Sequence, residues 1–346
     1  MKKIEKVLSR IDDFFVSLDS VPAKKTAVFL FVFISFVFVI IARRPDAVTY
    51  PQFYAEDGAF WFQEAYNNGA LYSFLIPKQG YFQTISRIGA AIAQLPPIEF
   101  APLTLNIIAI GIQTLPALFF LSSRFNNIVP SFSVRLAISL IYLFLPHSRE
   151  THVNITNSQW RLAILMYLVM IAKDSAKFAW KAFDFLALAI GGLSGPFSVI
   201  LAPIFFLYQR AKKIKKPLLF VTISLTAAIQ LAAAYFSIAG SRSPAPLGAG
   251  ITNFFKVISG HILIGGILGG KAINQIRGTS LWENGLLPIA AGLILTLILF
   301  YALKNSQDEI IFFIIFSAFI VAGALISPQV SMTKPQWAEM AKEPVN

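Results

Sequence analysis

The sequence predicts an all-α protein, a polytopic transmembrane bundle of about nine helices with a long external first loop that contains interfacial helices. Of its 346 residues, 56% are hydrophobic and 13% are charged, about half the charged share of soluble domains. Several apolar runs approach the roughly 20 residues that a helix needs to cross a bilayer. Lys and Arg stand in short clusters between these runs, as the positive-inside rule requires.

The same composition excludes several classes of function. The net charge of +12 does not indicate a nucleic-acid partner, because the basic residues alternate with membrane segments instead of covering one surface. The sequence contains no cysteine, which excludes disulfides, thiolate nucleophiles and cysteine-bound zinc. We expect membrane lipids to be direct partners.

Residues 1–23 predict a cytoplasmic amphipathic helix that precedes a transmembrane domain over 24–346. Apolar residues recur at helical spacing, with basic residues on the opposite side; they are Ile4, Val7, Leu8, Ile11, Phe14, Phe15 and Leu18. Two interpretations fit this pattern. The helix lies on an anionic cytoplasmic leaflet, or it is an ordinary amphipathic helix that packs on the protein.

Apolar runs predict the spans in order along the chain. They lie at 27–42, 100–121, 134–146 and 160–172, then as two short helices within 184–208, then at 217–238, 286–303 and 309–326. The pair within 184–208 follows from GGLSGPF (191–197), where glycine and proline interrupt a helix. Backbone groups freed at that depth must be buried in protein or face water, so we expect this broken hairpin to border an external cavity.

A cytoplasmic N-terminus makes the loops 43–97, 147–159 and 240–284 external. The first is the predicted catalytic loop. Within the third, VISGHILIGGILGG (257–270) is short and glycine-rich, which favours a re-entrant or interfacial segment over a span. The chain stops on the polar segment TKPQWAEMAKEPVN. Two alternatives stay open: an end on the external side, or a C-terminally incomplete chain.

Glu56 and Asp57, in YAEDGAF, are the first candidates for chemistry. Asp57 precedes a predicted short helix that Gly69 closes, so an N-cap is one interpretation. That role leaves Glu56 and the aromatic helix beyond unexplained. A carboxylate at the membrane surface could instead act as a general base on a hydroxyl group. Together the pair could also contribute oxygen ligands to a divalent metal such as Mg or Mn.

The predicted external segments contain further polar residues that could bind a substrate. In 78–97, Gln83 and Arg87 belong to a polar stripe on an apolar helix; Arg87 either binds an anionic head group or forms an internal salt bridge. PHSRETHVNITNSQWR (146–161) is dense in polar groups and is either a phosphate-contacting loop or a solvated connector. Its predicted substrate-binding residues are Arg149, His152, Gln159 and Arg161, and those of the loop 240–284 are Lys271 and Arg277. His147, Glu150 and His152 could bind metal, although their spacing matches no defined site.

The layout resembles the polytopic glycosyltransferases of the GT-C superfamily. The resemblance lies in AEDG (55–58) after the first span, in the arginine of QGYFQTISR (79–87), in multiple short spans and in the break at GLSGPF. It covers 40–210 best, and it is closest to bacterial members that decorate surface polysaccharide or lipid-linked glycans. Family members generally run longer at the C-terminus.

The resemblance implies a mechanism and a location. A polyprenyl-phosphate sugar would enter from the membrane, and Asp57, or after it Glu56, would deprotonate the hydroxyl of a glycan or lipid-linked acceptor, with inversion at the anomeric carbon. Arg87, Arg149, Arg161 or a cation of the loop 240–284 would stabilise the departing phosphate. The enzyme would lie in the bacterial cytoplasmic (inner) membrane, with its active face periplasmic or extracellular.

Two other classes of function compete with this interpretation. A transporter or lipid flippase could use the broken helix at 184–208 as a midplane binding site, but charges within the spans are nearly absent and no inverted repeat is visible. A non-catalytic membrane scaffold would need neither the acidic pair nor the arginine-rich loops.

Overall fold

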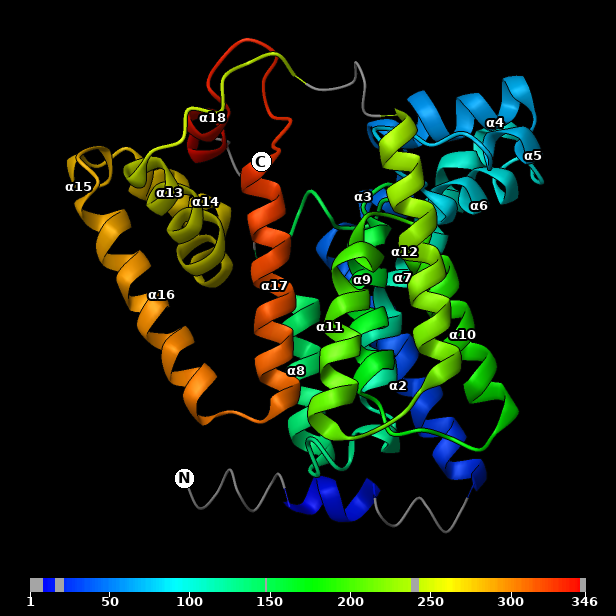
Figure 1. Ribbon diagram of the computed structural model, residues 1–346. Coiled ribbons are helices and arrows are strands. Elements are labelled where there is room, and N and C mark those ends of the chain that lie inside the picture. Colours follow the sequence, from blue (N-terminus) through cyan, green and yellow to red (C-terminus); the bar gives the residue numbers. More distant parts are fainter. Residues whose placement is uncertain (1–8, 16–21, 147, 238–242, 343–346) are drawn as a thin grey trace. The chain divides into compact units, whose positions relative to one another are not determined.

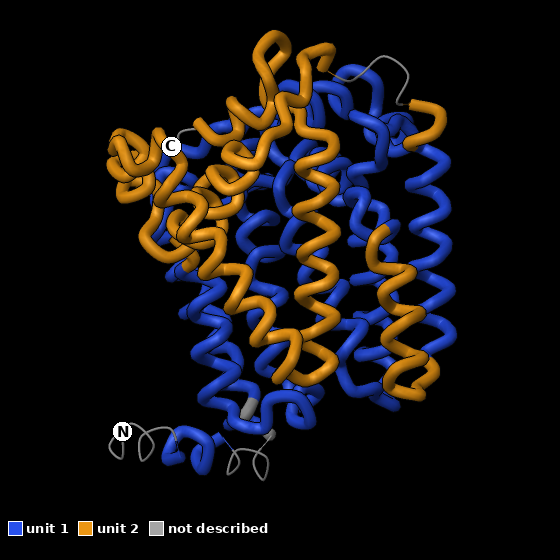
Figure 2. The backbone as a smooth tube through the Cα atoms, turned by 60° about the vertical axis from the view of Figure 1, so that its left-hand side comes forward, with its two compact units in different colours: residues 1–144, 151–199, 216–233 blue, residues 145–150, 200–215, 234–346 orange. Residues whose placement is uncertain are grey.

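The computed structural model describes residues 9–15, 22–146, 148–237 and 243–342 (Figure 1). Throughout that part of the chain the regular structure is helical, and no strand forms there. The chain divides into two compact units, which are described one at a time (Figure 2). The first comprises residues 1–144, 151–199 and 216–233, and the second 145–150, 200–215 and 234–346.

The first unit contains most of the predicted spans and the predicted catalytic loop. After a helical segment at 9–15, its helices are α2 (Pro22–Arg43), α3 (Asp46–Thr49), η2 (Asp57–Phe62), α4 (Gln63–Asn68), α5 (Ala70–Ser73), α6 (Thr84–Ile92), η3 (Ile98–Phe100), α7 (Ala101–Phe120), η4 (Ser123–Phe125), α8 (Phe132–Phe144), α9 (Ser158–Ile171), α10 (Phe178–Gly192) and most of α12 (Pro217–Ser237).

The second unit contains most of α11 and the C-terminal helices. They are α11 (Phe197–Lys212), α13 (Ile251–Val257), η5 (Ile258–Ile264), α14 (Gly265–Arg277), α15 (Ser280–Glu283), α16 (Leu286–Asn305), α17 (Asp308–Ile326) and α18 (Gln336–Lys342). Trp337 of α18 donates its indole N–H to the Leu325 carbonyl at 2.8 Å. The small apolar cluster of Val257, Leu325 and Ala341 lies beside this bond.

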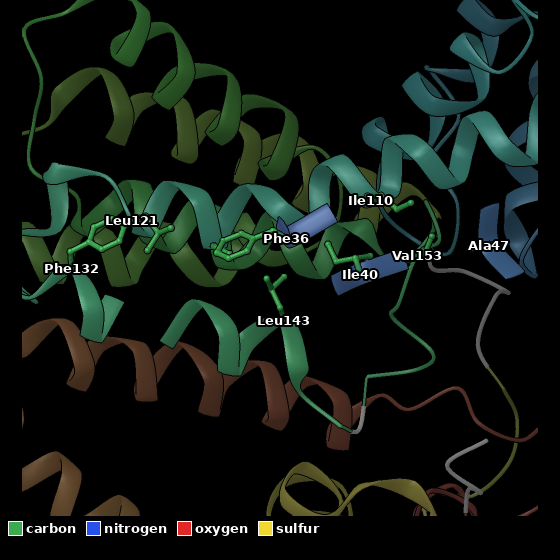
Figure 3. Packing of buried hydrophobic residues seen from close by; sticks show 9 residues of the cluster. Phe36, Ile40, Ala47, Ile110, Leu121, Phe132, Leu143 and Val153 are labelled. Carbon is green, nitrogen blue, oxygen red and sulfur yellow. The ribbon is translucent and has the colours of Figure 1, made fainter. Parts of the chain in front are cut away.

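An apolar cluster joins α2, α7 and α8 in the first unit (Figure 3). Its buried members are Phe36, Ile40, Ala47, Ile110, Ala117, Leu121, Phe132, Leu143 and Val153. Such interdigitated side chains gain many small dispersion contacts. In a lipid environment, close packing of this kind drives helix association more than water exclusion does.

Hydrogen bonds show that the helices of the first unit alternate between two ends. At one end, Arg124 after α7 forms a two-pronged pair with Asp184 of α10, at 2.6 and 2.7 Å, and its Nε donates to the Lys173 carbonyl after α9. Lys216, before α12, donates to the Ala172 carbonyl and pairs with Asp174 at 3.1 Å. The segments predicted to be cytoplasmic therefore meet at one end of this unit.

The opposite end gathers residues from 43–97 and 151–159, both predicted to be external. Arg44, which follows α2, donates to the carbonyls of His152 and Val153 at 2.9 and 3.1 Å. Residues of the α10–α11 break join them there, as described below. The assignment of these two ends to opposite sides of a membrane stays a prediction.

The helical segment at 9–15 packs on protein, the second of the two interpretations of the N-terminal pattern. The rings of Phe15 and Phe132 stack with centroids 3.4 Å apart. The carboxylate of Asp12 accepts a 2.8 Å hydrogen bond from the Ser133 N–H in the first turn of α8, where a carboxylate satisfies a free amide. The rest of the predicted helix, 1–8 and 16–23, lies outside the described residues except for 22 and 23, which begin α2.

Six helices of the described chain are long and apolar enough to cross a membrane. They are Thr26–Arg43, Ile98–Phe120, Pro217–Ser237, Ile251–Arg277, Leu286–Asn305 and Asp308–Ile326. The predicted spans at 27–42, 100–121, 217–238, 286–303 and 309–326 overlap them. The predicted count of about nine is not confirmed, because α8 and α9 are shorter, with 13 and 14 residues.

The segment 257–270 is helical and lies inside a stretch from Ile251 to Arg277, 27 residues long, that a kink at Gly269 interrupts. Its assignment as a re-entrant or interfacial segment stays a prediction. One of its glycines interrupts the helix, because Gly269 has φ +80° and forms a kink there. A left-handed φ of this kind favours glycine.

The predicted break at 191–197 is present, and protein groups satisfy the backbone that it frees. The Gln230 side chain on α12 donates to the Gly192 and Gly195 carbonyls, at 3.1 Å each, and accepts the Phe82 N–H at 2.8 Å. The first amides of α6, at Thr84 and Ile85, bond to the Leu193 carbonyl and Ser194 Oγ. Burial in protein is therefore how the structure meets the requirement for satisfied backbone groups.

Close packing of α10 on α12 depends on Gly192, and this predicts a stability effect. A Cβ at this position would overlap the Thr226 side chain. We expect Gly192→Ala to lower the unfolding free energy in detergent by about 1–3 kcal/mol, the usual range for overpacking. Thermal or denaturant unfolding followed by circular dichroism measures this.

Two further variants control the experiment. Thr226→Ala combined with Gly192→Ala should recover part of the loss. Gly111→Ala, in α7, adds a Cβ where no atom lies within 4 Å and should raise stability by about 0.5–1 kcal/mol. Equal losses in Gly192→Ala and Gly111→Ala would contradict the packing argument.

Candidate functional site

The buried carboxylate of Asp57 is the centre of the candidate site. It has no exposed surface. Its Oδ1 accepts hydrogen bonds from the Thr156 N–H at 2.9 Å and the Thr156 hydroxyl at 2.5 Å, and its Oδ2 accepts the Ile155 N–H at 3.2 Å. Asp57 thus connects the loop 43–97 with the segment that leads into α9.

Asp57 does not cap the helix that follows it, so the N-cap interpretation was wrong. The short helix does form, as η2 and α4, and Gly69 ends it with φ +86°. No side chain caps its start. The carboxylate instead accepts amides just before α9 (Ser158–Ile171), where negative charge suits a helix N-terminus.

Burial and hydrogen bonding act on Asp57 in opposite directions. Burial raises the pKa of Asp57 to about 6, although the hydrogen bonds from Thr156 and Ile155 lower it, and the negative charge of Glu56 raises it further. Burial prevails because moving a carboxylate out of water disfavours its charged form. Asp57 therefore titrates close to neutral pH.

A chain of polar contacts leads from Asp57 to Arg87. The Trp61 indole N–H donates to Thr156 Oγ1 at 2.8 Å, and the Arg87 guanidinium lies over the Trp61 ring, 4.9 Å from its centroid. Arg87 is 1% exposed and pairs with Glu64, its Nη1 lying 2.6 Å from Oε2. The geometry of that contact is poor for a hydrogen bond, so we describe it as an ion pair.

The charge of Arg87 is thus matched by Glu64 inside the protein. This contact is the internal salt bridge, one of the two interpretations of Arg87 from the sequence. Lys78 donates to the same carboxylate at 2.7 Å. Burial tends to raise the pKa of Glu64, but the hydrogen bonds and charges of Lys78 and Arg87 outweigh it and hold that pKa below its usual value. A phosphate on Arg87 would have to compete with Glu64.

His152 and Arg161 lie in a cationic part of the same end. The His152 ring is buried between the Gln113 amide, 2.9 Å from Nδ1, and the Ile40 carbonyl, 3.0 Å from Nε2. Burial lowers the pKa of His152 to about 4, and the charges of nearby arginines lower it as well. His152 is therefore neutral at pH 7. The neighbouring Arg161 donates hydrogen bonds to the carbonyl and hydroxyl of Thr151.

Glu56, Tyr81, Gln83 and Gln159 form a second polar group beside Asp57. Burial raises the pKa of Tyr81; a hydrogen bond from Gln159 lowers it and the charge of Glu56 raises it. Gln83 Nε2 lies 3.5 Å from the Tyr81 hydroxyl. Glu56 is only partly buried, whereas Asp57 is fully enclosed, so Glu56 is the more exposed of the two carboxylates.

The other predicted residues belong to the second unit. Arg149 and Lys271 are exposed and Arg277 is half-buried. Asp57, Arg87, Gln83, His152, Gln159 and Arg161 all belong to the first unit. Contacts connect Asp57 to Arg87 through Thr156 and Trp61, and they connect Gln83 and Gln159 through Tyr81. His147 lies outside the described residues.

Left-handed backbone marks the same loops. Within the described first unit, the non-glycine residues with positive φ are Ala55 at 39°, Gln79 at 54° and Val153 at 51°. Ala55 precedes Glu56, Gln79 lies in the turn before Tyr81, and Val153 lies two residues before Ile155, whose N–H Asp57 binds. Such positions cost on the order of 1 kcal/mol or more and cluster at functional sites.

A divalent metal does not fit the acidic pair well. Both oxygens of Asp57 already accept hydrogen bonds, which leaves few lone pairs for a metal. In the described part of the chain, no group of three or more acidic or histidine side chains that could hold a metal occurs. We therefore derive no chemical step through a metal.

Sequence reasoning missed Tyr81, Thr156, Glu64 and Gln230. Gln230 carried a usable signal, because an amide within an apolar span usually bonds to another helix or loop. Thr156 carried none, since its partner is 99 residues away in the chain.

Comparisons with known proteins give no match. No family model, curated protein or solved structure matches the chain. The resemblance to the GT-C superfamily therefore rests on the motifs at 55–58 and 79–87 and stays a prediction.

The raised pKa of Asp57 predicts a pH dependence of stability. The folded state holds its proton up to pH about 6, whereas the carboxyl has a pKa of 3.8 without its surroundings. The stability that protonated Asp57 contributes is thus complete below pH 4 and declines as the pH rises to 6. The total is at most about 3 kcal/mol.

The difference in unfolding free energy between the wild type and Asp57→Asn isolates this titration, because other carboxylates cancel. The wild type should lose stability relative to the variant between pH 4 and pH 6. A relative gain in that window would show that the hydrogen bonds from 155–156 outweigh burial.

Proposed function

We propose that the protein is a membrane glycosyltransferase that moves a sugar from a polyprenyl-phosphate donor to a glycan or lipid-linked acceptor. One observation supports it most: a buried, connected polar site forms from residues 43–97 and 151–159 at one end of an apolar helical unit. Polar groups held at the end of apolar helices suit a substrate with a lipid tail and a polar head. Membrane-length helices support access from the bilayer.

In this proposal the roles of the two carboxylates are reversed from the sequence prediction. Glu56 is the general base on the acceptor hydroxyl, because it is partly exposed. Asp57 is a positioning residue, because its oxygens already bind Thr156 and Ile155. A base must come within hydrogen-bond reach of the proton that it removes, which an enclosed carboxylate does not do.

The leaving phosphate requires a cation, and Arg161 is the best placed of those in the first unit. Its Nη2 donates to Thr151, its guanidinium lies against Tyr142, 5.3 Å from the ring centroid, and its buried Nε has no hydrogen-bond partner among the described residues. A guanidinium with free donors suits a phosphate, and positive charge offsets the charge that develops on the leaving group. Arg149, Lys271 and Arg277 belong to the second unit, and their role in phosphate binding stays a prediction from the sequence.

The proposal includes an orientation. The site end faces the periplasm or exterior of a bacterial cytoplasmic membrane, and the N-terminus is cytoplasmic, in keeping with the positive-inside pattern. The short helices α8, α9, α10 and α11 then count as crossings and, with α2, α7, α12, α16 and α17, give nine, while the stretch Ile251–Arg277 stays the re-entrant or interfacial segment of the sequence prediction. Local bilayer thinning or snorkelling side chains accommodate helices of this length.

The test is sugar transfer by Glu56→Gln. We expect at least about a 100-fold loss, the lower limit for removal of a general base, with unchanged thermal stability. Membranes that contain the full chain are supplied with radiolabelled polyprenyl-phosphate hexoses and pentoses, and the release of polyprenyl phosphate is measured.

Glu99→Gln is the matched control, since Glu99 is exposed just beyond the loop; it should keep full activity. Transfer by Glu56→Gln at the wild-type rate would remove Glu56 from the role of base. Absence of transfer by the wild type, together with movement of the lipid-linked sugar across the membrane, would favour the flippase alternative.

A further inference from the structure

Two buried glutamines lie beside one tyrosine hydroxyl with their carbonyl oxygens unused. Gln83 is 4% exposed and Gln159 is 6% exposed. Both side chains contact the hydroxyl of Tyr81, Gln83 through Nε2 at 3.5 Å. Neither Oε1 has a hydrogen-bond partner. Buried polar atoms are rarely left in this state.

Other buried glutamines of the same unit have satisfied carbonyls. Gln113 Oε1 accepts the Val153 N–H at 3.3 Å, and Gln230 Oε1 accepts the Phe82 N–H at 2.8 Å. The fold therefore supplies donors to buried amides where they are structural. Gln83 and Gln159 differ in that a donor is missing for each.

The backbone next to Gln159 is shaped to leave its carbonyl in place. Gly195 has φ +151°, a conformation that other residues rarely adopt, and a Cβ there would overlap Gln159 Oε1. The Gly195 carbonyl accepts a hydrogen bond from the Gln230 side chain at 3.1 Å, which fixes this segment of backbone. Glycine at position 195 therefore leaves the room that the Gln159 carbonyl occupies.

We propose that Gln83, Tyr81 and Gln159 bind the hydroxyl groups of a neutral sugar ring. Sugar hydroxyls are donors that the two Oε1 atoms lack, and the Tyr81 hydroxyl both donates and accepts. A phosphate offers these carbonyls only lone pairs, so this subsite takes the sugar and not its charged linkage. The partly exposed Glu56 lies beside it, and the inference rests on the proposed function because it assigns the sugar part of that substrate.

The test uses sugars without the lipid phosphate, so that it stands apart from catalysis. Binding of methyl glycosides of glucose, galactose and mannose to the full chain in nanodiscs is measured by saturation-transfer NMR and by competition. We expect at least one to bind. Gln83→Met and Gln159→Met should each weaken it at least tenfold, because a site built for a hydroxyl loses most when that hydrogen bond is lost.

Stability distinguishes this subsite from a structural role. Both variants should lose less melting temperature than Gln113→Met, since each removes an unpartnered carbonyl oxygen together with only one contact to the Tyr81 hydroxyl. The control Gln113→Met should lower the melting temperature and leave glycoside affinity unchanged.

Two binding results would overturn the inference: no glycoside binds the wild type, or the glutamine variants bind glycosides as well as the wild type. A loss of stability in both variants as large as that of Gln113→Met would also overturn it. That result would indicate structural amides that hold only an ordered water. The transfer assay separates the two proposals. Transfer that is insensitive to Gln83→Met and Gln159→Met would reject the subsite and leave the enzyme. Glycoside binding that depends on the glutamines, without any transfer, would retain the subsite and reject the enzyme.

Discussion

The buried carboxylate of Asp57 is the interaction on which the site end of the first unit depends. It is enclosed by protein, and three donors from Thr156 and Ile155 hold it. Leaving those donors unmatched would cost roughly 1–3 kcal/mol for each buried group. The two loops that meet there are 98 residues apart in the chain, so one side chain sets their register.

The remaining contacts extend this register outward. Trp61 links Thr156 to Arg87, whose charge is matched by Glu64. On another side, Gln230 binds the α10–α11 break to the residues before α6. The polar groups with free capacity, Glu56 and the glutamine carbonyls, lie on this rigid base. A well-supported first layer is what precise positioning of a substrate requires.

The sequence predicted the features that depend on local pattern. The all-helical class, the helix that ends at Gly69 and the break at 191–197 follow from apolar runs, glycine and proline, and the structure has all three. The helix at Ile251–Arg277 is longer than the apolar pattern of 257–270 suggested, with a kink at Gly269, because neighbouring helices override the low helix propensity of glycine.

Features that depend on distant partners could not be predicted. Arg87 has the sequence context of a residue at an interface, yet Glu64 pairs with it. Asp57 has the local pattern of an N-cap, yet its partners precede α9. Periodicity places a side chain on a face of a helix; it does not say which of several acceptors or donors faces it.

The central claim is that Asp57 and Thr156 hold the two loops together, and a double-mutant cycle tests it most directly. Asp57→Asn, Thr156→Val and the double variant are compared in unfolding free energy in the same detergent. The structure predicts a coupling energy of about 1–3 kcal/mol, as for residues in one hydrogen-bond network. Effects that add within about 0.5 kcal/mol, as for independent sites, would contradict it.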